Sequence, residues 1–200
     1  MYGILGGSFN PPHNAHIVIA TLSIEELDLE KLFVVPSYVP PHKSSADLAP
    51  FEKRFSWLRR IFSSIEKVEV VDVESKLPTP SYALRTVKWF KENVGKDLYF
   101  IVGEDALSYI ETWHRYEDLI GETRIAVYPR YCGKPFEEHA RKVLGKAYER
   151  ILWLNLPIIQ LSATQVRERA RRGLPLTGMV PHLIEREVRR FFKEAGSGGL

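Results

Sequence analysis

The chain has 200 residues, of which 44% are hydrophobic and 26% charged, and a net charge of +3; this is enough for one domain with a sizeable core and too few to require two. No hydrophobic run approaches the ~18 residues of a membrane span, and the N-terminus lacks the pattern of a secretion signal, so we expect a soluble, cytoplasmic protein without a membrane partner. The single cysteine, Cys132, excludes an internal disulfide and a cysteine-based zinc site, and we expect it to be inert.

Short apolar runs alternate with longer amphipathic stretches. Strands are predicted at 2–6, Leu32–Pro36, Val68–Val73, Leu98–Val102, Arg124–Tyr128 and Ile151–Leu154. Helices are predicted at 14–27, about 51–63, about 81–94, in two short pieces around 105–120, and at 136–146, about 163–171 and 183–194. This alternation predicts a doubly wound, Rossmann-like α/β fold, in which helices flank one parallel sheet. We expect a single domain over 1–195, with a small C-terminal helical part from about 162, and a flexible tail at 196–200.

The first predicted strand leads directly into Gly6–His16, which has the sequence G-G-S-F-N-P-P-H-N-A-H. A loop between a strand and a helix lies at the carboxyl edge of a parallel sheet, where ligands bind, and two glycines let backbone amides approach an anion closely. His13 and His16 are three residues apart at the helix start, so their rings face the same side. A capping pair or half of a metal site would also explain the histidines, but strand, glycines and helix together favour a phosphate-binding loop.

This loop resembles the (T/S)-x-x-H-x-G-H signature of the nucleotidylyltransferases, and most closely the G-G-(T/S)-F-x-P-x-H-x-G-H of bacterial nicotinate mononucleotide adenylyltransferases. Ala15 stands where the family usually has glycine, and we expect its methyl group to tighten the packing against the ligand without removing the site. The resemblance extends from residue 3 to about 181. It implies that ATP phosphates are bound by the loop residues Gly6, Gly7, Ser8 and Phe9.

A proline-rich loop with Lys43 follows the second predicted strand. Prolines hold the segment extended at the ligand-binding edge, from which a lysine can reach a phosphate as a mobile point charge. Spacing alone favours an ordinary surface lysine. The sequence P-P-H-K resembles the lysine loop of the family, which implies that Lys43 contacts the nucleotide triphosphate.

Residues 79–82 open the next predicted helix, and their spacing by itself indicates only a helix cap. The sequence P-S-Y resembles the family's P-S-Y-T segment, whose backbone amides receive the pyridine carboxylate. This resemblance implies that Tyr82, Ala83 and Leu84 contact nicotinate mononucleotide. Ala83 replaces the usual threonine, which keeps the backbone donor and removes any hydroxyl contact.

Gly103 and Asp105 follow the fourth predicted strand. A carboxylate just past a strand end can accept hydrogen bonds from ribose hydroxyls, although G-x-D is also common at helix N-caps. The segment resembles the family's G-x-D followed by a tryptophan, which implies that Trp113 stacks on the pyridine ring; core packing is the alternative for this side chain. His114 stands where the family tends to have tyrosine, and we include it in the expected acceptor site.

Ser162 and Gln165 form a predicted capping box, so a helix begins there with free amides at the same edge as the first loop. The sequence L-S-A-T-Q-V-R resembles the family's I-S-(S/A)-T-x-(I/V)-R, which implies that Ser162 and Thr164 bind phosphate. A guanidinium at Arg167 can fork onto phosphate oxygens. The segment at 128–133 fits the family pattern less well, and no role is assigned to Arg130 there.

The implied reaction joins ATP to the 5′-phosphate of nicotinate mononucleotide and gives nicotinate adenine dinucleotide and pyrophosphate. The acceptor phosphate has a second pKa of about 6, so it is largely ionised and attacks directly in line, without a covalent enzyme intermediate. We expect His13 and His16 to stabilise the α-phosphoryl transition state, and Lys43 and Arg167 to neutralise the pyrophosphate. Mg²⁺ is expected on the ATP oxygens, without metal ligands from the protein.

Other functions remain open at this point. The same loop serves pantetheine-phosphate adenylyltransferases and cytidylyltransferases, and a non-catalytic nucleotide sensor would keep the fold. Residues 159–200 hold eight Lys or Arg against four Asp or Glu, which an RNA-binding protein, an anionic ligand or solvated helix faces would explain. No RNA-binding signature supports a nucleic-acid partner, and the oligomeric state is left open.

Overall fold

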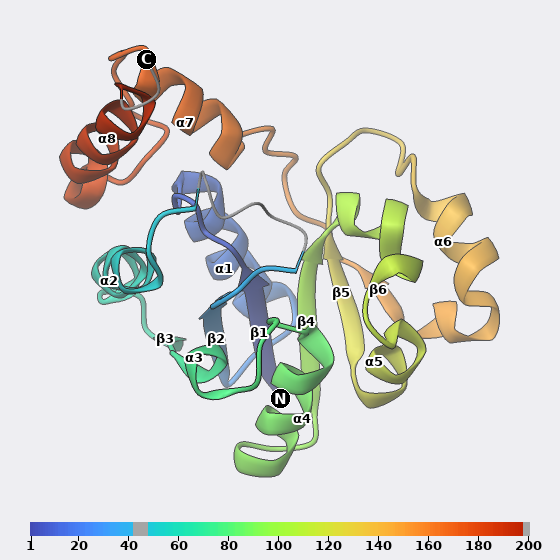
Figure 1. The fold of residues 1–200 in the computed structure, drawn as a ribbon. Helices are drawn as coiled ribbons and strands as arrows, with labels where there is room; N and C mark the ends of the chain where they lie inside the picture. The colour runs from blue at the N-terminus through green and yellow to red at the C-terminus, as the bar shows by residue number, and fades with distance from the viewer. Residues whose placement is uncertain (42–47, 198–200) are drawn as a thin grey trace.

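The computed structural model describes residues 1–41 and 48–197. In this part of the chain six parallel strands form one sheet in the order β3-β2-β1-β4-β5-β6 (Figure 1). The strands are β1 (Tyr2–Gly7), β2 (Lys31–Pro36), β3 (Val68–Val70), β4 (Leu98–Gly103), β5 (Arg124–Tyr128) and β6 (Ile151–Trp153). From β1 the following strands are added on one side of the sheet as far as β3, and then on the other side from β4 to β6. Doubly wound sheets open their ligand crevice at this switch, which here lies between β1 and β4. The predicted fold class is confirmed.

Helices connect the strands on both faces of the sheet. The α-helices are α1 (Asn14–Glu26), α2 (Phe51–Phe62), α3 (Val73–Lys76), α4 (Ala83–Asn93), α5 (Tyr116–Glu122), α6 (Glu137–Leu144), α7 (Ala163–Arg171) and α8 (His182–Ser197). The 3-10 helices of the described residues are η2 (Glu104–Thr112) and η3 (Gly145–Arg150). None of these helices is long and apolar enough to cross a membrane, within the residues that the structure describes.

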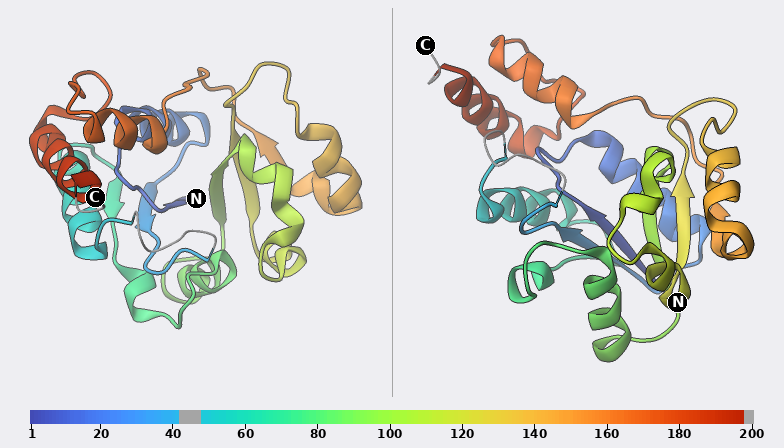
Figure 2. Two further views of the ribbon diagram at one scale, coloured as in Figure 1. Left: turned by 45° about the horizontal axis from the view of Figure 1, so that its top comes forward. Right: turned by 45° about the vertical axis from the view of Figure 1, so that its right-hand side comes forward.

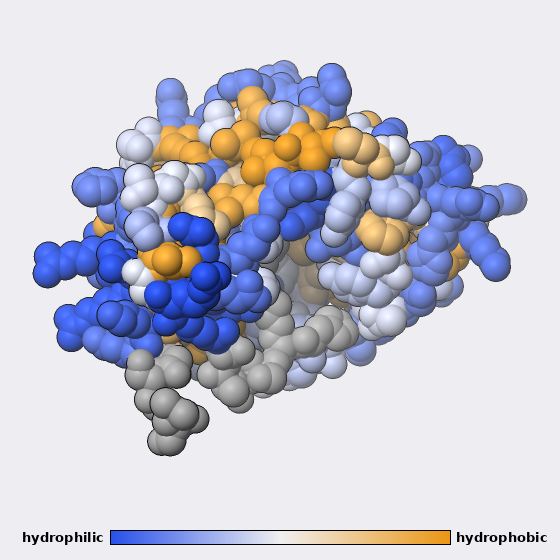
Figure 3. All heavy atoms as spheres, turned by 90° about the horizontal axis from the view of Figure 1, so that it is seen from above, coloured by the Kyte–Doolittle hydropathy of each residue, from blue (hydrophilic) through white to orange (hydrophobic). Residues whose placement is uncertain are grey.

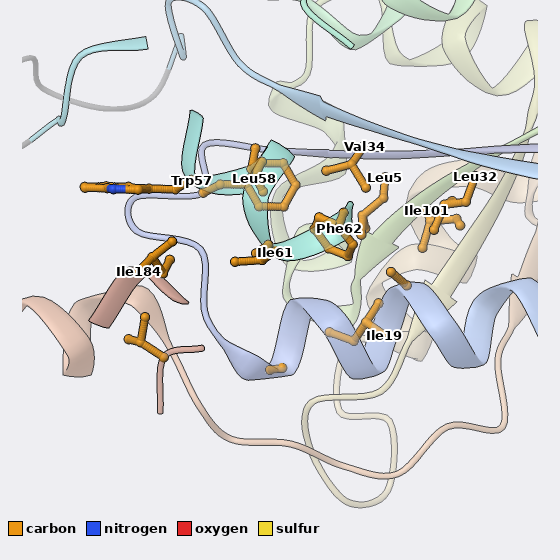
Figure 4. Close-up of a cluster of buried hydrophobic side chains, with 14 of the residues drawn as sticks. Leu5, Ile19, Leu32, Val34, Trp57, Leu58, Ile61, Phe62, Ile101 and Ile184 are labelled. Atoms are coloured by element: carbon orange, nitrogen blue, oxygen red, sulfur yellow. The ribbon is translucent and has the colours of Figure 1, made fainter. Parts of the chain in front are cut away.

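One core lies between the sheet and helices α1 and α2 (Figure 4). Because successive side chains of a strand point to opposite faces, Leu5, Val34 and Ile101 from three neighbouring strands share this side. Ile19 of α1 and Phe62 of α2 pack onto them. Burial of each such side chain stabilises the fold by roughly 1.5–3 kcal/mol, so the central strands are held firmly behind the loops that follow them.

A second core covers the opposite face. Ile4, Phe33 and Phe100 are the strand residues adjacent to those of the first core, and they pack against Leu84 and Val87 of α4. The strands therefore carry apolar side chains on both faces, as expected for a parallel sheet between two helical layers. The start of α4 is fixed to the sheet by this packing.

Helices α7 and α8 stand beyond the end of the sheet and are reached by an extended segment after β6 (Figure 2). Trp57 of α2 donates its indole N–H to Glu187 of α8 at 3.1 Å. Asn14, at the start of α1, donates its side-chain amide to the carbonyl of Gly178 at 2.7 Å and its backbone N–H to the carbonyl of Met179 at 2.9 Å. These contacts hold α8 against α2, and the segment between α7 and α8 against the start of α1.

The strand predicted at 68–73 is shorter in the structure and ends at Val70. The carbonyl of Asp72 accepts hydrogen bonds from the backbone N–H of Ser75 at 3.0 Å and from its hydroxyl at 2.7 Å, so the chain turns into α3. The apolar run continued past the strand because Val73 is buried in the second core. The hydrophobic pattern does not distinguish an apolar residue in a strand from one that follows the strand and is buried in a neighbouring helix.

Two further differences concern helices. The predicted pair around 105–120 consists of η2, which is kinked at Tyr109, and α5. The last helix extends to Ser197, beyond its predicted end at 194, and residues 198–200 of the predicted tail lie outside the described residues.

Cys132 is exposed and has a free thiol.

Candidate active site

A cavity of about 450 Å³ opens at the carboxyl edge of the sheet. Its wall is built from the segments that follow β1, β2, β4 and β5 and from the first turns of α4 and α7. Figure 3 looks down on this face, where hydrophilic side chains cover both flanks and a band of hydrophobic residues lies between them. All strands of a parallel sheet end at one edge, which brings the loops after β1, β2, β4 and β5 together.

Most of the residues singled out from the sequence line this one cavity, although they are spread over the whole chain. They are Gly6, Gly7, Ser8, Phe9, His13, His16, Tyr82, Ala83, Gly103, Asp105, Trp113, His114, Ser162, Thr164 and Arg167. The side chain of Leu84 is buried in the second core and does not line the cavity. Lys43 lies outside the described residues. The methyl group of Ala15 packs into the first core and not against the cavity, contrary to expectation.

The first loop is anchored by Arg54 of α2, which is 1% exposed. Its guanidinium donates to the carbonyl oxygens of Ser8 and Ala49, both at 2.8 Å. The side chain of Asn10 accepts the backbone N–H of Ala49 at 2.9 Å, which closes the same network. Burial lowers the pKa of Arg54 to about 10, so the side chain remains charged at neutral pH.

From the sequence a helix was predicted at about 51–63, but Arg54 was not singled out. The residue lies on the apolar face of α2, four and seven positions before Leu58 and Ile61. A charged side chain at that helical spacing is the signal that could have revealed it, because a buried guanidinium needs hydrogen-bond acceptors.

His13 and His16 form a stacked pair, with ring centroids 3.7 Å apart and an interplanar angle of 24°. The backbone N–H of His13 donates to Nδ1 of His16 at 3.0 Å, which leaves Nε2 of His16 as the nitrogen that carries the proton. His13 is 4% exposed. Burial and the positive charge of Arg130 lower the pKa of His13 to about 3, so its ring is neutral at physiological pH. A neutral ring stacks on His16 without charge repulsion.

Because Gly103 has no side chain, the side chains of Asp105 and Tyr128 come close to its backbone beside the cavity. A Cβ atom there would lie 2.4 Å from Oδ1 of Asp105 and 3.0 Å from the hydroxyl of Tyr128, so a side chain at this position would displace both groups. Burial raises the pKa of Tyr128 to about 12, which keeps this phenol neutral. Arg130 places its Nε 3.7 Å from Oδ1 of Asp105.

Arg130 and Tyr128 are cavity residues that sequence reasoning did not assign. The fully buried Glu104 holds the segment that carries them, because its Oε2 accepts the backbone N–H groups of Arg130 at 2.9 Å and Tyr131 at 3.1 Å. A glutamate between Gly103 and the following aspartate carries no recognisable sequence signal for this contact.

Aromatic side chains form another part of the wall. The rings of Tyr82 and His114 stack with centroids 4.1 Å apart and an interplanar angle of 15°. Trp113 meets Phe100 edge to face, with centroids 6.3 Å apart and an interplanar angle of 87°. Its buried indole N–H finds no hydrogen-bond partner among the residues that the structure describes. Trp113 thus combines core packing with a polar atom at the cavity wall.

The predicted capping box at the start of α7 is confirmed. The hydroxyl of Ser162 accepts the backbone N–H of Gln165 at 3.3 Å, and the side chain of Gln165 accepts the backbone N–H of Ser162 at 2.9 Å. Arg167 donates to the carbonyl of Asn10 at 2.8 Å and to the hydroxyl of Thr164 at 3.2 Å. This side chain therefore links α7 to the first loop.

The chain matches the cytidylyltransferase-like family model over residues 4–169. It is 50% identical to a Thermotoga maritima protein named "Probable nicotinate-nucleotide adenylyltransferase", with 95% of this chain and 91% of that protein covered. A Clostridium botulinum protein of the same name is 33% identical, over 90% and 92% of the two chains. The fold is similar to that of Plasmodium falciparum nicotinic acid mononucleotide adenylyltransferase complexed with NaAD, with a TM-score of 0.75, 21% identity and 95% of each chain covered. The chain therefore belongs to the family of nicotinate-nucleotide adenylyltransferases, among the cytidylyltransferase-like proteins.

Proposed function

We propose that this enzyme transfers the adenylyl group of ATP to the 5′-phosphate of nicotinate mononucleotide, with nicotinate adenine dinucleotide and pyrophosphate as products. The observation that carries the proposal is the stacked pair His13 and His16, which shares one cavity with the starts of α1 and α7. Backbone N–H groups of a first helical turn that have no partner within the helix can bind phosphate, so the start of α7 suits a phosphate-bearing substrate. Relatives named for nicotinate nucleotides support the same acceptor.

The proposed reaction is a direct in-line attack by the acceptor phosphate on the α-phosphorus of ATP. The acceptor oxygen bonds to the α-phosphorus while the bond to the bridging oxygen breaks, and pyrophosphate leaves with that electron pair. With a second pKa of about 6, the acceptor phosphate is mostly ionised, so no side chain has to remove a proton. Fixed hydrogen-bond donors at the developing charge then supply most of the acceleration.

The two histidines take this donor role in our proposal. The N–H at Nε2 of His16 is held by the contact of Nδ1 with the His13 backbone, and both groups line the cavity. His13 contributes a hydrogen bond and not a positive charge, because its pKa of about 3 keeps the ring neutral. Arg167, with Lys43 as a further cation, neutralises the departing pyrophosphate, which its position in the first turns of α7 supports.

No group of three or more His, Cys, Asp or Glu is arranged to hold a metal ion within residues 1–41 and 48–197. We propose that Mg²⁺ is carried by the substrate, since this ion retains much of its hydration and binds through phosphate oxygens. When bound to ATP it neutralises charge on the triphosphate. Gly6, Gly7, Ser8 and Phe9, with Ser162 and Thr164, are the residues that we propose as the phosphate-binding set.

The acceptor half of the proposed site lies around the start of α4. Backbone N–H groups of Ala83 and Leu84 are proposed to receive the pyridine carboxylate, while Tyr82, Trp113 and His114 surround the ring. Gly103 and Asp105 are proposed to belong to the ATP side, where the Asp105 carboxylate accepts ribose hydroxyls. The aromatic wall and the helix start support this assignment. We place the reaction in the cytoplasm, with neither a nucleic acid nor a membrane as partner.

Incubation of the purified protein with ATP, Mg²⁺ and one acceptor at a time tests the proposal. Pyrophosphate release and dinucleotide formation are followed with nicotinate mononucleotide, nicotinamide mononucleotide and phosphopantetheine. We expect the highest kcat/KM with nicotinate mononucleotide. Faster turnover of phosphopantetheine would point to another adenylyltransferase, and ATP binding without turnover of any acceptor would point to a nucleotide sensor.

A further inference from the structure

A buried carboxylate that the proposed mechanism does not use lies in the wall of the cavity. Glu74, the second residue of α3, is 7% exposed. Its Oε1 accepts the hydroxyl of Thr86 in α4 at 2.8 Å, and its Oε2 accepts the backbone N–H of Tyr38 after β2 at 3.3 Å. Burial raises the pKa of this carboxyl above its usual value, while the hydrogen bonds oppose that shift. A buried acid of this kind needs its donors, because an unpaired one is costly.

Ser81, directly before the first turn of α4, completes the arrangement. Its hydroxyl oxygen accepts the backbone N–H groups of Tyr38 at 2.9 Å and Val39 at 3.0 Å. The backbone N–H of Tyr38 is therefore shared between the hydroxyl of Ser81 and Oε2 of Glu74, which brings the two side chains to one point. The backbone N–H of Ser81 also donates to the carbonyl of Val39 at 2.9 Å.

Three segments that are distant in sequence therefore meet at one carboxylate: α3, the start of α4, and the chain that follows β2. Glu74, Ser81, Tyr82 and Ala83 all line the cavity. The hydroxyl of Thr86 fixes the far side of the first turn of α4, and the hydroxyl of Ser81 fixes its entry. The direction of the backbone N–H groups of Ala83 and Leu84 at the start of α4 thus depends on the side chain of Glu74 in α3.

We propose that Glu74 is a positioning residue for the acceptor, which sets the first turn of α4 against the segment after β2 so that its backbone amides face the acceptor carboxylate. The inference rests on the proposed function, because that function defines the acceptor. The two carboxylate oxygens of Glu74 accept the hydroxyl of Thr86 and the backbone N–H of Tyr38, so each is engaged by a donor from the protein.

The chemistry of the donors predicts different effects for two substitutions. In Glu74→Gln the carboxamide oxygen can still accept the backbone N–H of Tyr38, and the new NH₂ can donate to Thr86, whose hydroxyl rotates to accept it. In Glu74→Ala all of these contacts are lost. We expect Glu74→Ala to raise the KM for nicotinate mononucleotide about tenfold, and Glu74→Gln to raise it less than about threefold. The KM for ATP should change less than about twofold in both variants.

The matched control is Glu69→Ala in the neighbouring strand, where an exposed carboxylate pairs with Lys31 at 2.9 Å and is remote from the cavity wall. It should leave both KM values unchanged. Equal effects of Glu74→Ala on the KM values for ATP and acceptor, or an unchanged acceptor KM, would overturn the positioning role. If Glu74→Ala does not fold, Ser81→Ala removes the same link while Glu74 keeps its bond to Thr86, and it should raise the acceptor KM selectively.

A second readout needs no turnover. Hydrogen exchange of the backbone N–H groups of Tyr38, Val39 and Ser81 should accelerate at least about tenfold in Glu74→Ala, with little change in Glu74→Gln or Glu69→Ala. Unchanged exchange would contradict the junction itself. If exchange accelerates in Glu74→Ala as predicted but the wild-type enzyme makes no dinucleotide from a pyridine mononucleotide, the proposed function fails while the junction stands, so the two failures are distinguishable.

Discussion

The neutral state of His13 predicts a specific acid sensitivity of the fold. Its pKa falls from 6.5 to about 3 because burial and Arg130 disfavour the imidazolium. Below pH 6.5 the unfolded chain takes up a proton at this position and the folded chain does not, so the free energy of unfolding decreases as pH falls toward 3. At pH 7 the stabilisation is fully present. The slope of about 1.4 kcal/mol per pH unit gives a loss of about 2 kcal/mol between pH 6.5 and pH 5.

Urea unfolding of the wild type and of His13→Gln at pH 7 and pH 5 isolates this contribution. The substitution removes the titrating ring, so the stability difference between the two proteins should shift by about 2 kcal/mol in favour of the variant at pH 5. His182→Gln is the control, because His182 is exposed in the first turn of α8. A stability difference between wild type and His13→Gln that stays constant from pH 7 to pH 5 would refute a neutral, buried His13.

Three further substitutions test the site. Gly103→Ala should lower kcat/KM at least about tenfold, because its Cβ would lie 2.4 Å from Oδ1 of Asp105 and turn that carboxylate aside; wild-type kinetics would contradict this. Arg54→Met should destabilise the fold by about 2–4 kcal/mol in urea, because the carbonyls of Ser8 and Ala49 lose their donor, whereas an unchanged midpoint would contradict it. Trp113→Leu should raise the acceptor KM about threefold to tenfold and leave the KM for ATP unchanged; an equal rise in both would exclude stacking on the acceptor.

The arrangement of the cavity was predictable where a motif follows a strand. The glycine pair before His13, the Gly103 turn and the capping box at Ser162 each mark the carboxyl end of a strand or the start of a helix. Because a parallel sheet gathers all such ends at one edge, the sequence alone brings them together. Residues of all three segments line one cavity.

The buried polar residues behind that edge were not predictable in the same way. Arg54, Glu74 and Glu104 each make a hydrogen bond to a segment that is distant in sequence, at separations of 46, 12 and 26 positions. Such partners depend on how the loops pack, which periodicity and local spacing do not describe. The predicted end of β3 was wrong for a related reason: Val73 is apolar because it is buried in the second core, and not because it continues the strand.

The most direct test of the central claim is the kinetics of His16→Ala with ATP and nicotinate mononucleotide. In our proposal the N–H at Nε2 of His16 lies at the point of transfer. Loss of this donor should lower kcat by a factor of about 100 to 1,000, while the Kd for ATP and the unfolding midpoint change little. A single-turnover assay with a parallel measurement of ATP binding separates the two effects. Lost ATP binding with unchanged turnover at saturation would contradict a role of this histidine in the transfer step.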